Sequence, residues 1–154
     1  MIEIPNFKTL NITDIVCDYN GTIAKDGIVL PKIKKLFEAL SKNYTLHVIT
    51  ADTFGSVHTQ LKDYGTQIKV LTSDNHTKEK EDYISFLGAD NCAALGNGNN
   101  DKNMLLLASI GIAILGDEGC SRDSLLNADI ICKDIGDALT LFTNTKRLIA
   151  TLRN

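Results

Sequence analysis

Three short polar motifs in this sequence have residue types suited to phosphate or metal chemistry, and each follows an apolar run. Residues 18–22 read Asp-Tyr-Asn-Gly-Thr, so a carboxylate ends an apolar run and a glycine turn follows at once. Residues 50–53 read Thr-Ala-Asp-Thr, where a hydroxyl and adjacent backbone N–H groups can hold an anion at a helix N-terminus. Residues 96–101 read Gly-Asn-Gly-Asn-Asn-Asp, a glycine-rich turn that ends on a carboxylate.

Each motif taken alone also has a simpler interpretation. Asp18 before a glycine turn is typical of a turn or capping residue, and Thr50 or Asp52 can serve as a helix N-cap. The glycine-rich loop superficially resembles a dinucleotide-binding fingerprint. Asp101 stands where that fingerprint ends on glycine, however, and the loop follows a late strand rather than the first. Dinucleotide binding is therefore disfavoured, and the case for chemistry depends on the motifs in combination.

The elements that must position these motifs alternate between strands and helices. The hydrophobic patterns predict strands at 12–17, 44–50, 67–71, 92–95, 110–115 and 129–132. They predict helices at 31–40, 53–64, 78–87, from the glycine-rich loop to 109, at 121–127, and one or two over 134–152. A small edge strand or hairpin is expected in the first dozen residues, and a short β-flap at 23–30.

This alternation predicts an α/β fold: a doubly wound, mostly parallel, Rossmann-like sheet with helices on both faces. With 154 residues, the chain is expected to form a single domain over 1–154. Such sheets bind ligands beyond the carboxyl ends of their strands. The three motifs all follow strands, so we expect them to meet at that edge.

In this order, the motifs resemble those of the haloacid dehalogenase (HAD) superfamily of phosphotransferases. The shared pattern is Asp-x-x-Gly-Thr after the first core strand, a Thr ending the second, a Lys before the next strand, and Gly-x-Gly-x-x-Asp. The stretch 96–116, followed by Ala128-Asp129-Ile130, is most similar to the soluble phosphorylation domain of P-type ATPases. The resemblance runs from about residue 12 to 140 and implies a HAD-like sheet.

The resemblance implies roles for the residues that bind phosphate. Asp18 matches the nucleophile that forms an aspartyl-phosphate, and it also binds magnesium. Gly21 and Thr22 match a turn that helps to hold phosphate. Thr50, with the backbone of Ala51, matches the group that binds the transferring phosphoryl group.

A lysine and a metal loop complete the implied site. Lys80 fits the lysine that neutralises the nucleophile and phosphate, with Lys78 as the alternative. Asn97 and Asp101 occupy the two acidic positions of the loop that binds Mg²⁺, and the backbone carbonyl of Asn20 is a further metal ligand.

Two amides depart from the pattern of the superfamily. Asn20 stands where its phosphatases carry an aspartate as general acid and base, and an amide cannot shuttle a proton. Asn97 replaces the first acidic residue of the metal loop. The expected function is a magnesium-dependent phosphohydrolase or phosphotransferase with slow turnover. The alternative is a catalytically weak regulatory domain that binds phosphate or a partner.

A third interpretation, a response-regulator receiver domain, shares the doubly wound sheet and an acceptor aspartate. It requires an adjacent acidic pair near the first core strand, which this sequence lacks. The superfamily's usual cap insertions also have no room, since 13 residues separate Asp18 from Pro31 and the stretch 71–80 is shorter still. We therefore expect no cap domain, and a large phosphorylated substrate, a protein partner or a second subunit is needed to cover the open site.

Composition narrows the classes of function that this protein could have. Sixteen Lys and Arg against nineteen Asp and Glu give a net charge of −3, which disfavours nucleic-acid binding. No apolar run approaches a membrane span, and the N-terminus does not resemble a signal peptide, so a soluble cytoplasmic protein is expected. We expect the cysteines to be reduced structural thiols: Cys17, Cys92, Cys120 and Cys132. We expect the histidines to be structural or exposed on the surface: His47, His58 and His76.

Overall fold

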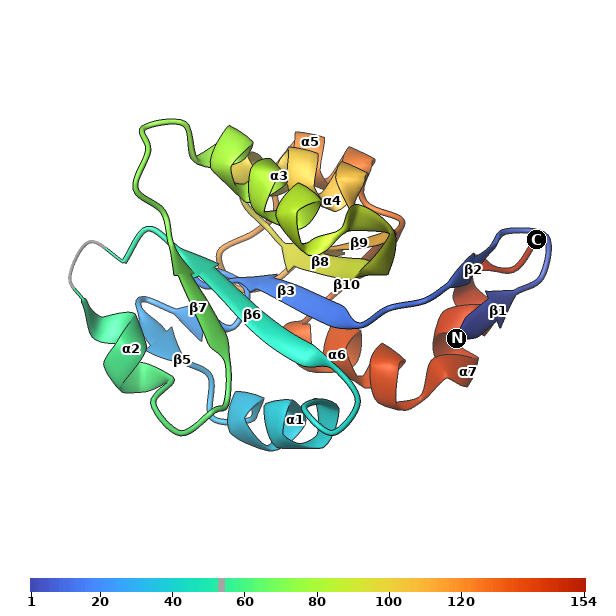
Figure 1. Ribbon diagram of the computed structural model, residues 1–154, viewed down its shortest axis with the longest axis horizontal. Coiled ribbons are helices and arrows are strands. Elements are labelled where there is room, and N and C mark those ends of the chain that lie inside the picture. Colours follow the sequence, from blue (N-terminus) through green and yellow to red (C-terminus); the bar gives the residue numbers. More distant parts are fainter. Residues whose placement is uncertain (53–54) are drawn as a thin grey trace.

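A six-stranded parallel sheet forms the centre of the computed structural model, which describes residues 1–52 and 55–154 (Figure 1). The spatial order of its strands is β10-β9-β8-β3-β6-β7. Their bounds are Asp14–Asp18 for β3, Thr45–Thr50 for β6, Gln67–Val70 for β7, Cys92–Gly96 for β8, Ile110–Ile114 for β9 and Ile130–Cys132 for β10. The chain winds outward from β3 to β6 and β7, then returns to pair β8 with the other side of β3. The carboxyl end of β3 is therefore the switch point of a doubly wound sheet, as the sequence predicts.

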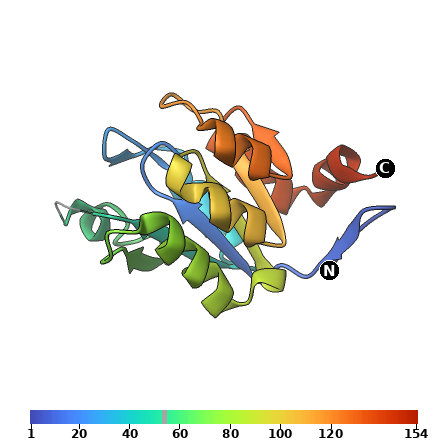
Figure 2. The same ribbon diagram turned by 90° about the horizontal axis from the view of Figure 1, so that it is seen from above.

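Helices cover both faces of this sheet, as Figures 1 and 2 show. One face carries α1, α2 and α6, and the other carries α3, α4 and α5, while α7 packs on α6 and β1 beyond the end of the sheet. Their bounds are Ile33–Leu40 for α1, Ser56–Gln60 for α2, His76–Leu87 for α3, Lys102–Leu107 for α4, Arg122–Asn127 for α5, Ile135–Thr143 for α6 and Thr145–Leu152 for α7. Because both faces are covered, all residues of β8 and β9 are buried, which explains their uninterrupted apolar sequences.

Two short hairpins lie outside the central sheet. Strands β1 (Ile2–Ile4) and β2 (Lys8–Leu10) pair with each other and pack near α7, as a separate ribbon rather than an added edge strand. Strands β4 (Ala24–Lys25) and β5 (Ile28–Val29) form the expected flap directly after β3. Its Asp26-Gly27 turn has positive φ at both residues, the backbone of a tight hairpin turn.

The predicted elements differ from the observed ones mainly at their ends. Of the predicted helix 53–64, only Ser56–Gln60 is helical, and residues 53–54 lie outside the described part of the chain. The helix predicted to reach 109 begins as the 3₁₀ turn Asn99–Asp101, and α4 ends at Leu107. The segment 134–152 forms two helices. Among the helices described, none has the length and apolar character to cross a bilayer.

Candidate active site

The three sequence motifs meet at the carboxyl ends of three adjacent strands. Asp18 is the last residue of β3, Thr50 the last of β6, and Gly96 the last of β8. A pocket of about 240 Å³ opens there. Its lining residues are Asp18, Asn20, Thr50, Ala51, Leu71, His76, Lys80, Asn97, Gly98 and Asn100.

Lys80 is the centre of the polar contacts in this pocket. Its side chain is buried on α3, and Nζ donates to Asp18 Oδ1 at 2.8 Å, Asp101 Oδ1 at 2.7 Å and Asn100 Oδ1 at 3.0 Å. Lys78 instead lies on the exposed side of α3, 2.9 Å from Asp82 Oδ1. Of the two candidate lysines, only Lys80 thus reaches Asp18.

The start of α3 is fixed by local capping. The side chain of Asn75 accepts a hydrogen bond from the backbone N–H of Lys78, and the carboxylate of Glu79 accepts from the N–H groups of Thr72 and Ser73. The Ser73 N–H is the main reason that the pKa of Glu79 falls to about 2. Glu79 therefore stays charged and ties the loop after β7 to the first turn of α3, next to Lys80.

Burial and like charge dominate the electrostatics of Asp18. Burial raises its pKa and the nearby Asp101 raises it further, while Lys80 lowers it, with a net value of about 7. Burial opposes the charged form of Lys80, but the carboxylates of Asp18 and Asp101 outweigh it and raise the lysine's pKa. The site therefore holds a charged ammonium beside a carboxylate that is costly to ionise.

Asp101 lies behind this lysine rather than in the pocket lining. Its side chain is fully buried, with Oδ1 on Lys80 and Oδ2 accepting the backbone N–H groups of Asn97 at 3.0 Å and Gly98 at 2.9 Å. Both carboxylate oxygens of the predicted metal ligand Asp101 are thus engaged by the protein. In this structure the residue orients Lys80 and the loop 96–98.

Gly21 and Thr22, the predicted phosphate turn, are not among the residues that line the pocket of Asp18. They line a neighbouring hollow of about 520 Å³, between the flap and the loop after β9. The Thr22 hydroxyl contacts Asn97 Oδ1 at 3.4 Å, and Asn97 Nδ2 donates to the Gly119 carbonyl at 3.1 Å. Gly21 has a φ of +77°, and a side chain there would collide with the Asn97 amide. The turn therefore packs against Asn97, which lines the pocket of Asp18.

The oxygen donors of the pocket fit a hard cation such as Mg²⁺. The carboxylate of Asp18 and the residues Asn20 and Asn97 line the same pocket and supply carboxylate, carbonyl and amide oxygens. Mg²⁺ takes oxygen ligands and is commonly bound by one or two carboxylates together with substrate phosphate. This donor set fits a metal whose coordination is completed by phosphate.

Known proteins of similar structure share this arrangement of strands and helices. A 3-deoxy-D-manno-octulosonate 8-phosphate phosphatase from Moraxella catarrhalis, solved with magnesium, phosphate and its sugar-acid ligand, superposes with a TM-score of 0.72 at 19% identity, over 93% of this chain and 94% of that one. A HAD superfamily hydrolase from Legionella pneumophila gives a TM-score of 0.74 at 15% identity, over 92% and 87%. The chain has the HAD fold.

Other comparisons add a pump domain and a sequence relative. The catalytic domain of the CPx-ATPase CopB-B matches the HAD fold of this chain with a TM-score of 0.63 at 26% identity, over 75% of this chain and 46% of that one. An uncharacterised protein of Methanocaldococcus jannaschii is 51% identical over 61 residues, which are 40% of this chain and 66% of that protein. No family model matches the chain.

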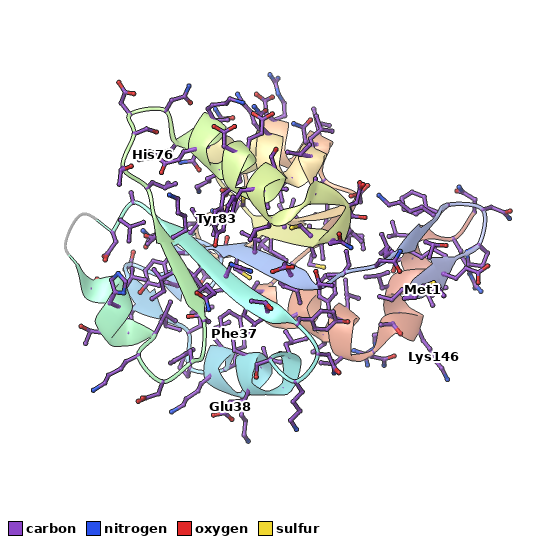
Figure 3. All side chains as sticks on the ribbon, in the orientation of Figure 1. Met1, Phe37, Glu38, His76, Tyr83 and Lys146 are labelled. Atoms are coloured by element: carbon purple, nitrogen blue, oxygen red, sulfur yellow. The ribbon has the colours of Figure 1, made fainter. Side chains whose placement is uncertain are left out.

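Two further residues, for which the sequence motifs predict no role, line the pocket. Asn100 accepts a hydrogen bond from Lys80, and His76 lies at the start of α3, one turn before Lys80 (Figure 3). His76 was expected to be structural or exposed, whereas it is half-buried and lines the pocket. Its spacing of four residues from Lys80 is the signal that could have found it, since such residues share a helix face.

We expect the Asp18→Asn substitution to stabilise the metal-free protein at neutral pH. The folded pKa of Asp18, about 7, lies above its ordinary value of 3.8, so the folded state binds this proton more tightly than the unfolded state. Parent stability should therefore fall as the pH rises from about 4 to 7. The variant lacks this loss, so its free energy of unfolding at pH 7 should exceed that of the parent by about 1–3 kcal/mol.

Urea unfolding at several pH values in the presence of a chelator measures this difference. Asp134→Asn is a control for which the opposite change of stability with pH is expected. The pKa of Asp134 is lowered, chiefly by the hydrogen bond from the backbone N–H of Asp137. Asp134 should stabilise the parent at neutral pH and lose that contribution as the pH falls. A stability difference between Asp18→Asn and parent that does not change with pH would contradict the electrostatic account.

Proposed function

We propose that this chain is a magnesium-dependent phosphohydrolase that acts through an aspartyl-phosphate on Asp18. The observation that carries the proposal is the position of the Lys80 ammonium, 2.8 Å from Asp18 Oδ1 in a pocket at the switch point of the sheet. A buried cation beside a carboxylate favours binding of a dianionic phosphate and lowers the cost of ionising the carboxylate to its nucleophilic form. Both are requirements for phosphoryl transfer to an aspartate.

The reaction would proceed in two steps at the Asp18 carboxylate. In the first, a carboxylate oxygen attacks phosphorus, the bond from phosphorus to the leaving-group oxygen breaks, and that oxygen takes a proton from water. In the second, water attacks the phosphorus of the aspartyl-phosphate and loses a proton to solvent. The bond from phosphorus to the Asp18 oxygen breaks, which regenerates the carboxylate and releases inorganic phosphate. Lys80 and the Thr50 hydroxyl, both lining the pocket, would hold the phosphoryl oxygens through both steps.

The leaving group would extend from this pocket toward the flap. An adjoining hollow of about 350 Å³ shares Asn20, Thr50 and Ala51 with the pocket of Asp18 and continues to the flap turn at Asp26 and Gly27. Asn20 therefore stands between the phosphate and the leaving group, where other HAD phosphatases are expected to carry their proton shuttle. The absence of a carboxyl group at this position predicts slow proton transfer.

Magnesium would be held by Asp18, the carbonyl of Asn20 and the amide of Asn97. When bound, the cation would neutralise phosphate charge and orient the phosphoryl group for in-line attack. Asp101 would contribute indirectly, because its oxygens already hold Lys80 and the backbone of the loop. The similar phosphatase from Moraxella catarrhalis was solved with magnesium and phosphate, which supports the choice of magnesium as the metal.

A p-nitrophenyl phosphate assay with fresh protein tests the proposal. Turnover should require added magnesium, disappear with a chelator and depend on Asp18. A second candidate function is favoured by Asn20 and Asn97: a regulatory domain that binds phosphate but turns it over poorly. Saturable magnesium-dependent binding of inorganic phosphate without Asp18-dependent turnover would support that function and reject the phosphohydrolase.

We expect Asn20→Asp to raise turnover of phosphate monoesters by about 10²-fold or more, since that is the usual size of general acid–base assistance. The gain should be greatest for an alkyl phosphate, whose leaving oxygen needs a proton, and smaller for an aryl phosphate. Steady-state rates on both substrates at saturating magnesium measure the effect. The same rate as the parent on both substrates, with the fold verified, would show that the amide does not limit turnover.

We expect Asn97→Asp to tighten magnesium binding roughly tenfold, because affinity rises with the charge of the ligands. The substitution also removes the hydrogen bond from Asn97 Nδ2 to the Gly119 carbonyl, so thermal stability should be followed in parallel. Calorimetric titration with MgCl₂ measures the affinity. Asn99→Asp adds the same charge outside the pocket lining and serves as the control. Equal affinity changes in the two variants would show that Asn97 is not a metal ligand.

A further inference from the structure

A second polar cluster, in which His47 is buried and Asp14 and Tyr83 are half-buried, lies at the opposite end of the strands that carry the active site. His47 Nε2 is 2.7 Å from Asp14 Oδ1, and His47 Nδ1 is 2.8 Å from the Tyr83 hydroxyl. Because a carboxylate only accepts, Nε2 donates to Asp14, and the other ring nitrogen, Nδ1, forms the hydrogen bond with the Tyr83 hydroxyl. The Thr13 hydroxyl donates to Asp14 Oδ2 at 2.6 Å. The proposed reaction does not use any of these groups.

Each member of the Asp14–His47–Tyr83 cluster belongs to an element that also carries an active-site residue. Asp14 begins β3 and Asp18 ends it. His47 lies on β6, which ends at Thr50, and Tyr83 follows Lys80 by one turn of α3. Figure 3 shows Tyr83 beneath α3, between that helix and the sheet. The cluster thus ties together the two strands and the helix whose relative placement brings Lys80 to Asp18.

Helix α3 has little other attachment to the sheet. Of its twelve residues, only Lys80 and Ile84 are fully buried, and its remaining surface is rich in charged side chains. Ile84 packs with Val16 and Ile49 in the apolar layer between the cluster and the active site. Apolar contacts are not directional, whereas hydrogen bonds fix distance and angle. Lys80 and Tyr83, one turn apart on α3, are hydrogen-bonded to residues of β3 and β6 and so fix the distance of the helix from these strands, beside its packing on α4 and the contacts of Glu79 with β7 and the loop that follows it.

We propose that Tyr83, held by His47 and Asp14, is a positioning residue that sets the placement of α3 and so the contact of Lys80 with Asp18. The inference rests on the proposed function for its catalytic consequence, although the placement of α3 can be tested without it. Without the Tyr83 hydroxyl, the ring still packs against His47, at 5.6 Å between ring centroids, but the helix loses its directional anchor. Lys80 then spends less time in contact with Asp18.

Tyr83→Phe and Tyr44→Phe form a matched pair of variants. Tyr44 is also half-buried, donates its hydroxyl to the Phe142 carbonyl at 3.3 Å, and packs on the opposite face of the sheet. Each substitution removes one hydroxyl group. We expect Tyr83→Phe to lower kcat on p-nitrophenyl phosphate about three- to tenfold, the equivalent of one hydrogen bond, and Tyr44→Phe to leave kcat unchanged.

Inhibition by orthovanadate separates positioning from a merely structural loss. Vanadate imitates the transferring phosphoryl group, so its inhibition constant should rise in Tyr83→Phe by the same factor as kcat falls. A loss of folded protein would reduce the active fraction and leave that constant unchanged. Asp14→Asn keeps the shape of the cluster and removes its charge. It should change kcat and the vanadate inhibition constant in the same directions as Tyr83→Phe, by smaller factors. It serves as the second variant if Tyr83→Phe does not fold.

Amide hydrogen exchange tests the placement of α3 independently of turnover. Tyr83→Phe should speed exchange in the first half of α3, including Lys80, and Tyr44→Phe should not. Equal exchange rates of α3 in the two variants, or an unchanged vanadate inhibition constant in Tyr83→Phe, would overturn the inference. Neither result would contradict the proposed phosphohydrolase function. Absence of Asp18-dependent turnover in the parent would instead reject the proposed function, and the exchange result would still decide the role of Tyr83.

Discussion

Replacing Asp18 with asparagine is expected to lower magnesium-dependent turnover of an aryl phosphate by about 10⁴-fold or more, to the background rate. An amide has no anionic oxygen to attack phosphorus, and the two-step route has no substitute nucleophile at this position. Asp18 ends a strand at the edge of the pocket, so the fold should survive the change. Steady-state rates, with circular dichroism to verify folding, measure the effect.

Asp82→Asn is the matched control for this loss. Asp82 lies on the exposed surface of α3, where it pairs with Lys78 outside the pocket. The same chemical change there should leave turnover unchanged. Parental activity in purified Asp18→Asn would contradict the proposed mechanism, and deamidation of the new asparagine is checked by mass spectrometry of the assayed sample.

Replacing Lys80 with methionine is expected to have the largest effect on stability. The buried carboxylates of Asp18 and Asp101 both contact this ammonium, and its removal leaves two like charges without a cation. Loss of one partner of a buried ion pair costs about 3–5 kcal/mol. Turnover should fall by about 10³-fold as well, since the phosphoryl group loses its positive partner.

Urea unfolding at neutral pH measures the stability loss, and Lys78→Met is the control. Lys78 is exposed on the same helix, so its removal should leave both stability and turnover unchanged. Lowering the pH should restore part of the stability of Lys80→Met, because protonation of Asp18 removes one of the two charges. A Lys80→Met protein as stable as Lys78→Met would contradict the account of the buried charges.

Much of the fold could be predicted because the hydrophobic pattern of each strand agrees with its burial in the sheet. The β-branched run before Asp18 and the apolar run before Gly96 are buried on both faces, so their sequences identify them as central parallel strands. The rule that ligands bind at the carboxyl ends of such strands then places Asp18, Thr50 and Asn97 together. The ends of helices were less predictable, because the glycine-rich loop ends in a 3₁₀ turn, Asn99–Asp101, that precedes α4.

Parts of the candidate site depend on contacts between distant segments and could not be read from spacing. Lys78 and Lys80 are two residues apart, and only the packing of α3 on the sheet decides which of them faces Asp18. Asp101 has a metal ligand's position in the sequence, yet Lys80 and two backbone N–H groups occupy its oxygens. The Asp14–His47–Tyr83 cluster joins residues from three separate elements and leaves no motif in the sequence.

Detection of a covalent phosphate on Asp18 tests the central claim most directly. The protein is incubated with magnesium and acetyl phosphate, quenched in acid, and treated with borohydride, which converts an aspartyl-phosphate to homoserine. Peptide mass spectrometry then locates the change. The account predicts homoserine at position 18 in the parent, and none in protein incubated without magnesium or in Asp18→Asn. Phosphate turnover by the parent with an unmodified Asp18, or with the modification on another residue, would contradict it.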